Sequence, residues 1–173
     1  MTSAPLPFFV YGTLRPGQYN HDLFLRGRTA AAEPATLAGA LLYDGPGYPY
    51  AIEERADGAA GAGAVAGDLV TAAPGEYGEL LSVLDTLEEF YGPGHPLNVY
   101  DRVARDAVRP DGTAVRAWVY VAAPRLEREL RRSGDVIPGG DWLNRGSGSG
   151  TGPGPDPRPG QGPSPARRGP RTP

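Results

Sequence analysis

The segment Phe8–Asn20, FFVYGTLRPGQYN, begins as an apolar strand and breaks into a glycine-containing turn. The uninterrupted apolar run Phe8–Tyr11 predicts a buried strand. Gly12 then allows the chain to turn, and Thr13 offers a side chain that can hydrogen-bond to nearby backbone. A glycine after a strand also exposes successive N–H groups, which can hold a carboxylate or a developing oxyanion. Taken alone, the turn favours the plain structural interpretation.

The composition predicts one folded domain followed by a tail. The chain has 173 residues, of which 39% are hydrophobic, enough for a single globular core. In the last 28 residues, however, 16 are Gly or Pro. Such a segment buries too little apolar surface to offset its ordering entropy. We therefore predict a folded domain over residues 1–145 and a disordered Gly/Pro/Arg-rich tail over residues 146–173.

The charged and reactive residue types exclude several functions. The tail carries four arginines and one aspartate, so residues 1–145 carry a net charge of −6 within a total of −3. An acidic domain argues against nucleic-acid binding. The chain has no cysteine, and all 17 basic residues are arginine, which excludes thiol nucleophiles and Schiff-base lysines. His21 and His95 lie far apart, with no spacing that suggests a metal site, so we expect no metal.

The N-terminal residues lack the features of an export signal. They have no basic start and no long apolar stretch, and no run of about 18 apolar residues occurs in the sequence. We therefore expect a soluble, cytoplasmic protein with no membrane partner. The sequence does not indicate the oligomeric state.

Hydrophobic periodicity and turn signals predict an α+β domain. Beyond the first strand, we expect strands at Ala35–Asp44 and Ala64–Val70, a helix at Pro74–Phe90, a hairpin formed by Val99–Pro110 and Thr113–Ala122, and a short charged helix at Arg125–Arg132. The stretch Gly45–Ala51 is predicted to be a loop. The fold class is therefore mixed, a mainly antiparallel small β-barrel with a few flanking helices.

The predicted long helix carries a carboxylate on its apolar face. Glu88 follows Leu81 by seven residues and Leu84 by four, so it should point inward, whereas Glu89 is turned by about 100° toward solvent. Burial raises the pKa of a carboxyl group, which suits it to exchange protons near neutrality. The spacing is equally consistent with a frayed helix end, at which Glu88 has no chemical role.

Several motifs together resemble one known family. FVYGTLRPGQYNHDLF is similar to the N-terminal motif of the γ-glutamylcyclotransferase-like superfamily, particularly its γ-glutamylamine cyclotransferase and AIG2-like branches. The segments GALLYDGPGYPYA, LDTLE, YDR, WVYV and IPGGDW follow in the family's order, so the resemblance spans nearly all of residues 7–142. It implies the γ-glutamylcyclotransferase-like fold. It also implies cofactor-free release of 5-oxoproline and an amine from a γ-glutamyl amide.

The resemblance also implies a set of site residues. Glu88 takes the position of the family's catalytic acid and base. The backbone of Tyr11, Gly12, Thr13 and Leu14 takes the position of the substrate cradle. Tyr100 and Tyr120 are further candidates for contact with the substrate, although aromatic packing on strands explains either one singly. The candidate site residues are therefore Glu88, Tyr11, Gly12, Thr13, Leu14, Tyr100 and Tyr120.

Two neighbouring features have structural interpretations. Arg102 can form an ion pair with Asp85 or with Glu88, and a structural pair is at least as plausible as a substrate contact. Asn20 and His21 match the family's residues after the turn, and we interpret them as stabilising it. Glu89 departs from the family, which often has glycine at this position.

Two other functions stay open at this stage. The protein can be a non-catalytic binding module for a γ-glutamyl-like or other small anionic ligand, or an interaction protein that acts through its tail. If it is an enzyme, the sequence does not identify the leaving amine. Specificity should depend on the loops Gly45–Tyr50 and Tyr91–Val99.

Overall fold

Five strands close into a barrel in the computed structural model, which describes residues 4–54 and 63–145. In barrel order the strands are β1 (Phe8–Val10), β5 (Ala64–Ala72), β2 (Thr29–Ala38), β6 (Tyr100–Val108) and β7 (Ala114–Ala122). All neighbours pair antiparallel except β1 and β7, which close the barrel in parallel with Phe8 opposite Trp118. The predicted mixed, mainly antiparallel barrel is therefore confirmed.

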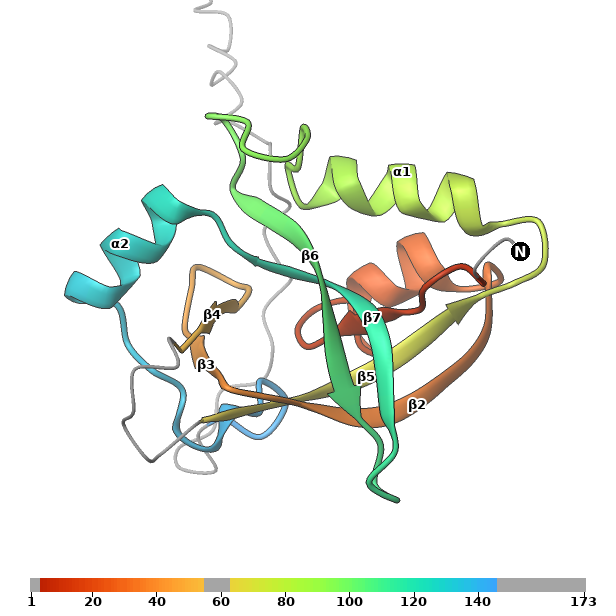
Figure 1. Ribbon diagram of the computed structural model, residues 1–173, viewed down its shortest axis with the longest axis horizontal. Helices are drawn as coiled ribbons and strands as arrows, with labels where there is room; N and C mark the ends of the chain where they lie inside the picture. The colour runs from red at the N-terminus through yellow and green to blue at the C-terminus, as the bar shows by residue number, and fades with distance from the viewer. Residues whose placement is uncertain (1–3, 55–62, 146–173) are drawn as a thin grey trace, which may run out of the picture.

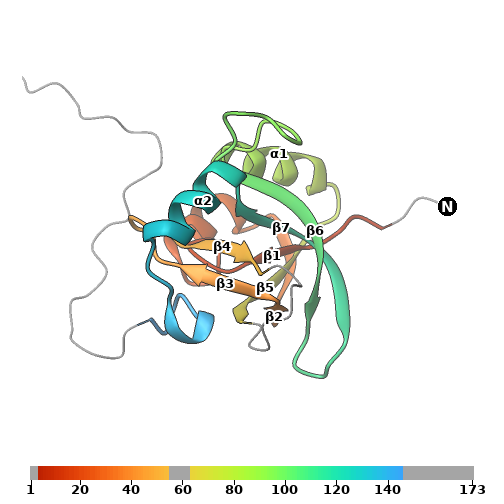
Figure 2. The ribbon, with the colours of Figure 1, turned by 60° about the vertical axis from the view of Figure 1, so that its left-hand side comes forward.

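The remaining elements flank this barrel (Figures 1 and 2). They are η1 (a π-helical turn, His21–Leu25), the ribbon of β3 (Ala40–Tyr43) and β4 (Tyr50–Glu53), α1 (Tyr77–Leu87), α2 (Pro124–Ser133) and η2 (a 3-10 turn, Pro138–Gly140). In both views α1 covers one end of the barrel and α2 lies beside the β3–β4 ribbon. A hydrogen bond of 2.7 Å from Arg131 Nη2 to the carbonyl oxygen of Glu53 ties α2 to this ribbon.

Strand β1 is buried on both faces and divides the core. Phe8 and Val10 pack in one cluster with Leu80 and Leu84 of α1. Phe9, one residue out of phase, packs in a second cluster with side chains of the other barrel strands. This division follows from the two-residue repeat of a strand, in which successive side chains point to opposite faces. The C-terminal end of β1 therefore emerges between two packed layers.

Several predicted element boundaries are wrong, among them the end of the long helix, which lies at Leu87 rather than at Phe90, and the start of β2, which lies at Thr29 rather than at Ala35. The strand predicted at Ala35–Asp44 is interrupted at Gly39, whose φ of 72° takes the chain out of β2 and into β3. Strand β4 begins at Tyr50, inside the stretch predicted to be a loop. Helix α1 begins at Tyr77 rather than Pro74, because Gly75, with a φ of 83°, is part of a turn.

The other predicted elements are confirmed. Strands β6 and β7 form the expected hairpin, with Tyr100 opposite Ala122 and Val108 opposite Ala114. Helix α2 covers the predicted short charged helix with one residue more at each end. The predicted tail at 146–173 lies outside the described residues.

Candidate active site

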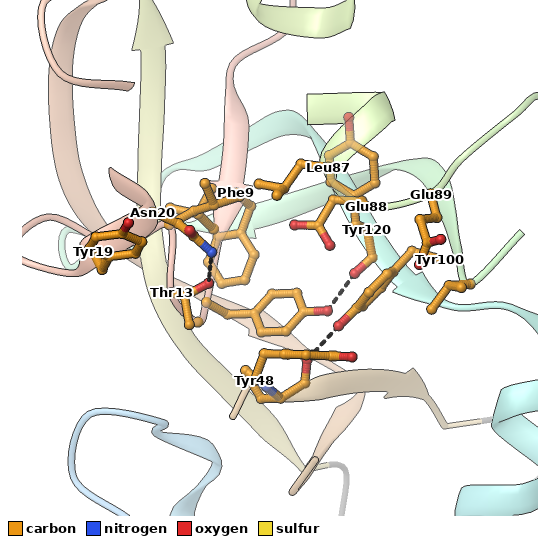
Figure 3. A pocket seen from close by; sticks show the side chains of 16 residues that line it. Phe9, Thr13, Tyr19, Asn20, Tyr48, Leu87, Glu88, Glu89, Tyr100 and Tyr120 are labelled. Carbon is orange, nitrogen blue, oxygen red and sulfur yellow. Dashed lines mark hydrogen bonds between the residues drawn. The ribbon is translucent and has the colours of Figure 1, made fainter. Parts of the chain in front are cut away.

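The seven residues singled out in the sequence line one pocket, here called the inner pocket (Figure 3). They come from the end of β1 and the turn after it, the end of α1, and strands β6 and β7. The residues are Tyr11, Gly12, Thr13, Leu14, Glu88, Tyr100 and Tyr120. Segments separated by about 75 residues or more in sequence therefore meet, because the barrel places β1 beside β7.

The turn after β1 uses its carbonyl groups for internal hydrogen bonds. The carbonyl oxygen of Gly12 accepts from the N–H of Arg15, and that of Thr13 accepts from the N–H of His21. Nδ1 of His21 lies 2.9 Å from the carbonyl oxygen of Leu14. Within the described ranges, no hydrogen bond has the N–H of Gly12, Thr13 or Leu14 as its donor. These three N–H groups are therefore available to a ligand with negative charge.

Side chains after the turn hold it in place. The amide of Asn20 donates to the hydroxyl oxygen of Thr13 at 2.8 Å, so the stabilising roles predicted for Asn20 and His21 are confirmed. Arg15 also holds the turn, because its Nε lies 2.7 Å from Oδ2 of Asp68 and its Nη1 lies 3.0 Å from Oδ1 of Asp141. The turn is thereby connected to β5 and to the end of the domain.

Gly12 is required by close packing. A Cβ atom at this position would lie 2.7 Å from Cδ of Pro49. That separation is shorter than real Cβ contacts, so Pro49 would have to move. The glycine therefore allows the loop before β4 to close over the turn.

Glu88 occupies the C-terminal cap of α1 and lines the inner pocket. Its N–H donates to the carbonyl oxygen of Leu84 at 2.9 Å. Two residues later, the N–H of Phe90 donates to the carbonyl oxygen of Asp85, also at 2.9 Å. The helix end is therefore not frayed. As predicted, Glu89 is exposed whereas Glu88 is partly buried, and Figure 3 shows Glu88 extending into the group of labelled side chains.

Burial controls the protonation of Glu88. Loss of solvent raises the pKa of its carboxyl group to about 8, and the nearby negative charge of Glu89 raises it further in the same direction. Near neutrality this group exists in both forms, so it can accept a proton and return it.

Three of the tyrosines that line the pocket, Tyr11, Tyr100 and Tyr120, donate their hydroxyl protons to protein groups. Tyr11 donates to the carbonyl oxygen of Tyr120 at 2.5 Å, and Tyr100 donates to that of Pro49 at 2.9 Å. Tyr120 donates to Oδ1 of Asp85 at 2.7 Å. Burial raises the pKa of all three phenols, so they stay protonated. Toward a substrate, their oxygens can act only as hydrogen-bond acceptors, and their rings form the walls.

Arg102 pairs with Asp85, which decides between the two partners considered from the sequence. Its Nε lies 3.3 Å from Oδ1 of Asp85. The guanidinium also stacks against the rings of Phe90 and Trp118, 5.3 and 4.5 Å from their centroids. Arg102 is not among the residues that line the inner pocket, so its contacts are structural.

Sequence reasoning did not single out several residues of the pocket wall, namely Tyr19, Tyr48, Pro49, Leu87 and Val99. Tyr48 and Pro49 belong to a loop that was expected only to affect specificity. A signal was present, because two tyrosines flank Pro49 directly after the glycine-containing segment Gly45–Gly47. The ring centroid of Tyr50 lies 5.5 Å from that of Tyr48 and 5.3 Å from that of Tyr100, so the loop is held by aromatic contacts.

Residues 4–54 and 63–145 show neither a metal-binding cluster nor a membrane-spanning helix. No group of three or more His, Cys, Asp or Glu side chains is placed to hold a metal ion. Among the same residues, no helix has the length and apolar character needed to cross a membrane.

Comparison with known proteins identifies the family. A sequence profile described as "Gamma-glutamyl cyclotransferase, AIG2-like" matches residues 8–144. The chain belongs to this family. The resemblance noted in the sequence is thereby confirmed, and all seven candidate residues lie inside the matched region.

A curated relative gives a more specific similarity. The chain is 35% identical over 113 residues to the gamma-L-glutamyl-butirosin B gamma-glutamyl cyclotransferase of Niallia circulans. The match covers 65% of this chain and 64% of the relative, so the chain spans less than two thirds of that protein's length.

Two solved structures share the fold of this AIG2-like domain. An uncharacterized protein of Pyrococcus horikoshii is 21% identical, with a TM-score of 0.51, and the match covers 79% of this chain and 89% of that one. YkqA of Bacillus subtilis is also 21% identical, with a TM-score of 0.52, but the match covers 79% of this chain and 39% of YkqA. At this identity the likeness concerns the fold alone.

Proposed function

We propose that this protein is a γ-glutamyl cyclotransferase that converts a γ-glutamyl amide into 5-oxoproline and a free amine, with Glu88 as the general acid and base. Membership of the family and the curated relative support a cyclotransferase. The arrangement of the inner pocket supports the more specific reaction.

The substrate supplies its own nucleophile. The α-nitrogen of the glutamyl group attacks the γ-carbonyl carbon, a five-membered ring forms, and the bond from that carbon to the amide nitrogen breaks. An intramolecular attack of this kind needs a folded substrate and a proton carrier rather than a cofactor. The tyrosine walls of the inner pocket, with hydroxyls fixed to the protein, suit it to hold such a compact conformation.

Glu88 carries the protons. The α-ammonium group must lose a proton before it attacks, and the ionised carboxylate of Glu88 accepts it. The acid form then protonates the departing nitrogen. Over the whole reaction the α-nitrogen loses two protons and the amine, released as an ammonium ion, gains two, so atoms and charge balance when Glu88 acts twice.

The turn after β1 binds the negative charge. The residues that line the inner pocket include no arginine and no histidine, and the chain has no lysine. The substrate α-carboxylate, or the oxyanion that forms at the γ-carbon, must therefore be held by neutral donors. The N–H groups of Gly12, Thr13 and Leu14 are such donors, without an internal acceptor in the described part of the chain.

The observation that carries the proposal is the location of Glu88. A carboxyl group whose pKa is raised to about 8 lines the same pocket as a turn with available N–H groups. Placing a partly buried carboxylate beside this turn costs free energy, and a role in proton exchange accounts for its presence there.

The test is 5-oxoproline release from a panel of γ-glutamyl amides by the wild type and by Glu88→Gln. We expect the variant to fold and to lose at least about a hundredfold in kcat. Glu79→Gln is the matched control, because Glu79 is exposed on the same helix and should keep wild-type turnover. Normal turnover by folded Glu88→Gln would refute the mechanism. Calorimetric binding of the amides by the wild type without conversion would indicate a binding module instead.

A further inference from the structure

A second hollow, here called the outer groove, adjoins the inner pocket. It is lined by Phe24, Ser82, Val83, Thr86 and Tyr91, together with Leu87 and Glu89, which also line the inner pocket. The groove therefore begins where the inner pocket ends, along the last turn of α1. A substrate whose reacting head lies beside Glu88 can extend past Glu89 into this groove.

The two hollows carry only negative charge. Their charged lining residues are Glu88 and Glu89, and neither lining includes an arginine or histidine. Glu88 is needed for proton transfer, whereas Glu89 has no part in the proposed reaction. Within the described ranges, Glu89 forms no ion pair, and its side chain is exposed.

The backbone of Glu89 is held in place by two hydrogen bonds. Its N–H donates to the carbonyl oxygen of Thr86 at 3.3 Å, and its own carbonyl accepts from the N–H of Val99 at 3.1 Å. Its φ of 51° puts it in the left-handed region that favours glycine, where a side chain costs about 1–2 kcal/mol. Figure 3 shows the side chains of Glu88 and Glu89 diverging, the first into the pocket and the second at its edge.

We propose that the leaving group is a diamine or polyamine and that Glu89 binds its second ammonium group where the inner pocket meets the outer groove. This inference rests on the proposed cyclotransferase function, which supplies the first nitrogen. The methylene chain of such an amine would pack on Phe24, Val83 and Leu87. Tyr91, a residue that is 58% exposed, offers an aromatic face to the cation.

The test compares two γ-glutamyl amides of matched length. One has 1,4-diaminobutane as its amine and keeps a free ammonium group, and the other has n-pentylamine, which ends in a methyl group. With wild-type protein we expect kcat/KM to be about three- to tenfold higher for the diamine, mostly through KM, as for one exposed ion pair with an aromatic neighbour. The preference should decrease as salt is added.

The matched variants are Glu89→Gln and Glu89→Gly. Removing the Glu89 charge also lowers the pKa of Glu88, which affects both amides alike, so the informative quantity is the ratio of their kcat/KM values. We expect this ratio to fall to about one in both variants. Glu89→Gly should also be more stable than the wild type because it relieves the left-handed conformation. Loss of preference in a more stable protein cannot be attributed to unfolding.

The outcomes separate this inference from the proposed function. Equal kcat/KM for the two amides in the wild type, or a wild-type ratio retained by Glu89→Gln, would overturn the role of Glu89 and leave the cyclotransferase intact. If other γ-glutamyl amides yield 5-oxoproline but the diamine amide does not, the inference also fails. If no γ-glutamyl amide yields 5-oxoproline, the proposed function fails, and the inference fails with it because it rests on that reaction.

Discussion

The hydroxyl of Tyr120, on β7, donates a hydrogen bond to Oδ1 of Asp85, on α1, with 2.7 Å between the two oxygens. The same carboxylate oxygen lies 3.3 Å from Nε of Arg102 on β6. Asp85 therefore connects the pocket wall to the helix whose cap is Glu88. The distance between the proton carrier and the opposite wall depends on this contact.

Removing the Tyr120 hydroxyl should loosen the wall. We expect Tyr120→Phe to lower kcat by about three- to tenfold and the free energy of unfolding by about 1 kcal/mol, because one partly buried hydrogen bond is lost. Steady-state kinetics and urea unfolding measure the two effects. Tyr77→Phe is the control, since the Tyr77 hydroxyl oxygen accepts from Trp118 at 2.9 Å outside the inner pocket. A similar fall of kcat in both variants would contradict a specific role for Tyr120.

Arg102 should matter mainly for stability. Arg102→Met keeps much of the packing against Phe90 and Trp118 but leaves the Asp85 carboxylate without its cation. We expect a loss of about 2–4 kcal/mol in the free energy of unfolding. Adding Asp85→Asn to Arg102→Met should restore part of the lost free energy of unfolding. Chemical denaturation of both single variants and the double variant, analysed as a double-mutant cycle, measures this. Additive losses would show that the two side chains do not interact.

The activity should depend on pH through Glu88. Its carboxylate must be ionised to accept a proton, and burial raises its pKa to about 8. We therefore expect kcat/KM to fall about tenfold for each pH unit below about pH 8. A pH–rate profile checks this, with Glu79→Gln as the control for a general charge effect. An activity that stays constant from pH 8 to pH 5 would exclude Glu88 as the base.

The same group predicts the pH dependence of stability. Because the pKa of Glu88 is raised from 4.5 to about 8 on folding, the folded protein binds the proton more tightly than the unfolded chain. The contribution of protonated Glu88 to the free energy of unfolding is complete below about pH 4.5 and is lost as pH rises through about 8. Glu88→Gln should therefore be more stable than the wild type by about 1–3 kcal/mol at pH 9, and equal to it near pH 4. Thermal unfolding at both pH values measures the difference, and a variant that is less stable at pH 9 would contradict it.

Gly12 should not tolerate even a methyl group. The Cβ of Gly12→Ala would lie 2.7 Å from Cδ of Pro49, whose carbonyl oxygen holds Tyr100. We expect Gly12→Ala to lower the free energy of unfolding by about 1–3 kcal/mol and to raise KM, because the pocket wall must shift. Gly78→Ala is the control: a Cβ there meets no atom, and alanine in α1 should stabilise by about 0.5–1 kcal/mol. If Gly12→Ala matches the wild type in stability and KM, the close packing does not constrain the turn.

The sequence predicted the elements whose patterns are local. The apolar run before Gly12, the helical spacing of Leu80, Leu84 and Glu88, and the turn of the β6–β7 hairpin each lie within one short segment. Strand β4 was missed for the opposite reason. Residues Tyr50–Glu53 become a strand because they pair with β3, and proline and glycine residues just before them favour a loop.

For the site, the sequence by itself determined which chemical groups are present: one inward carboxylate on the stripe of α1, a glycine turn after a buried strand, and no lysine or cysteine. The tertiary structure decided how they are used. The hydroxyls of Tyr11 and Tyr100 donate to backbone carbonyl groups. Arg102 forms its ion pair with Asp85 rather than with Glu88, and Pro49 packs against Gly12. The tertiary structure also placed Glu89 between two hollows. Spacing along a chain defines the face of one element, whereas contacts between elements depend on how the barrel closes.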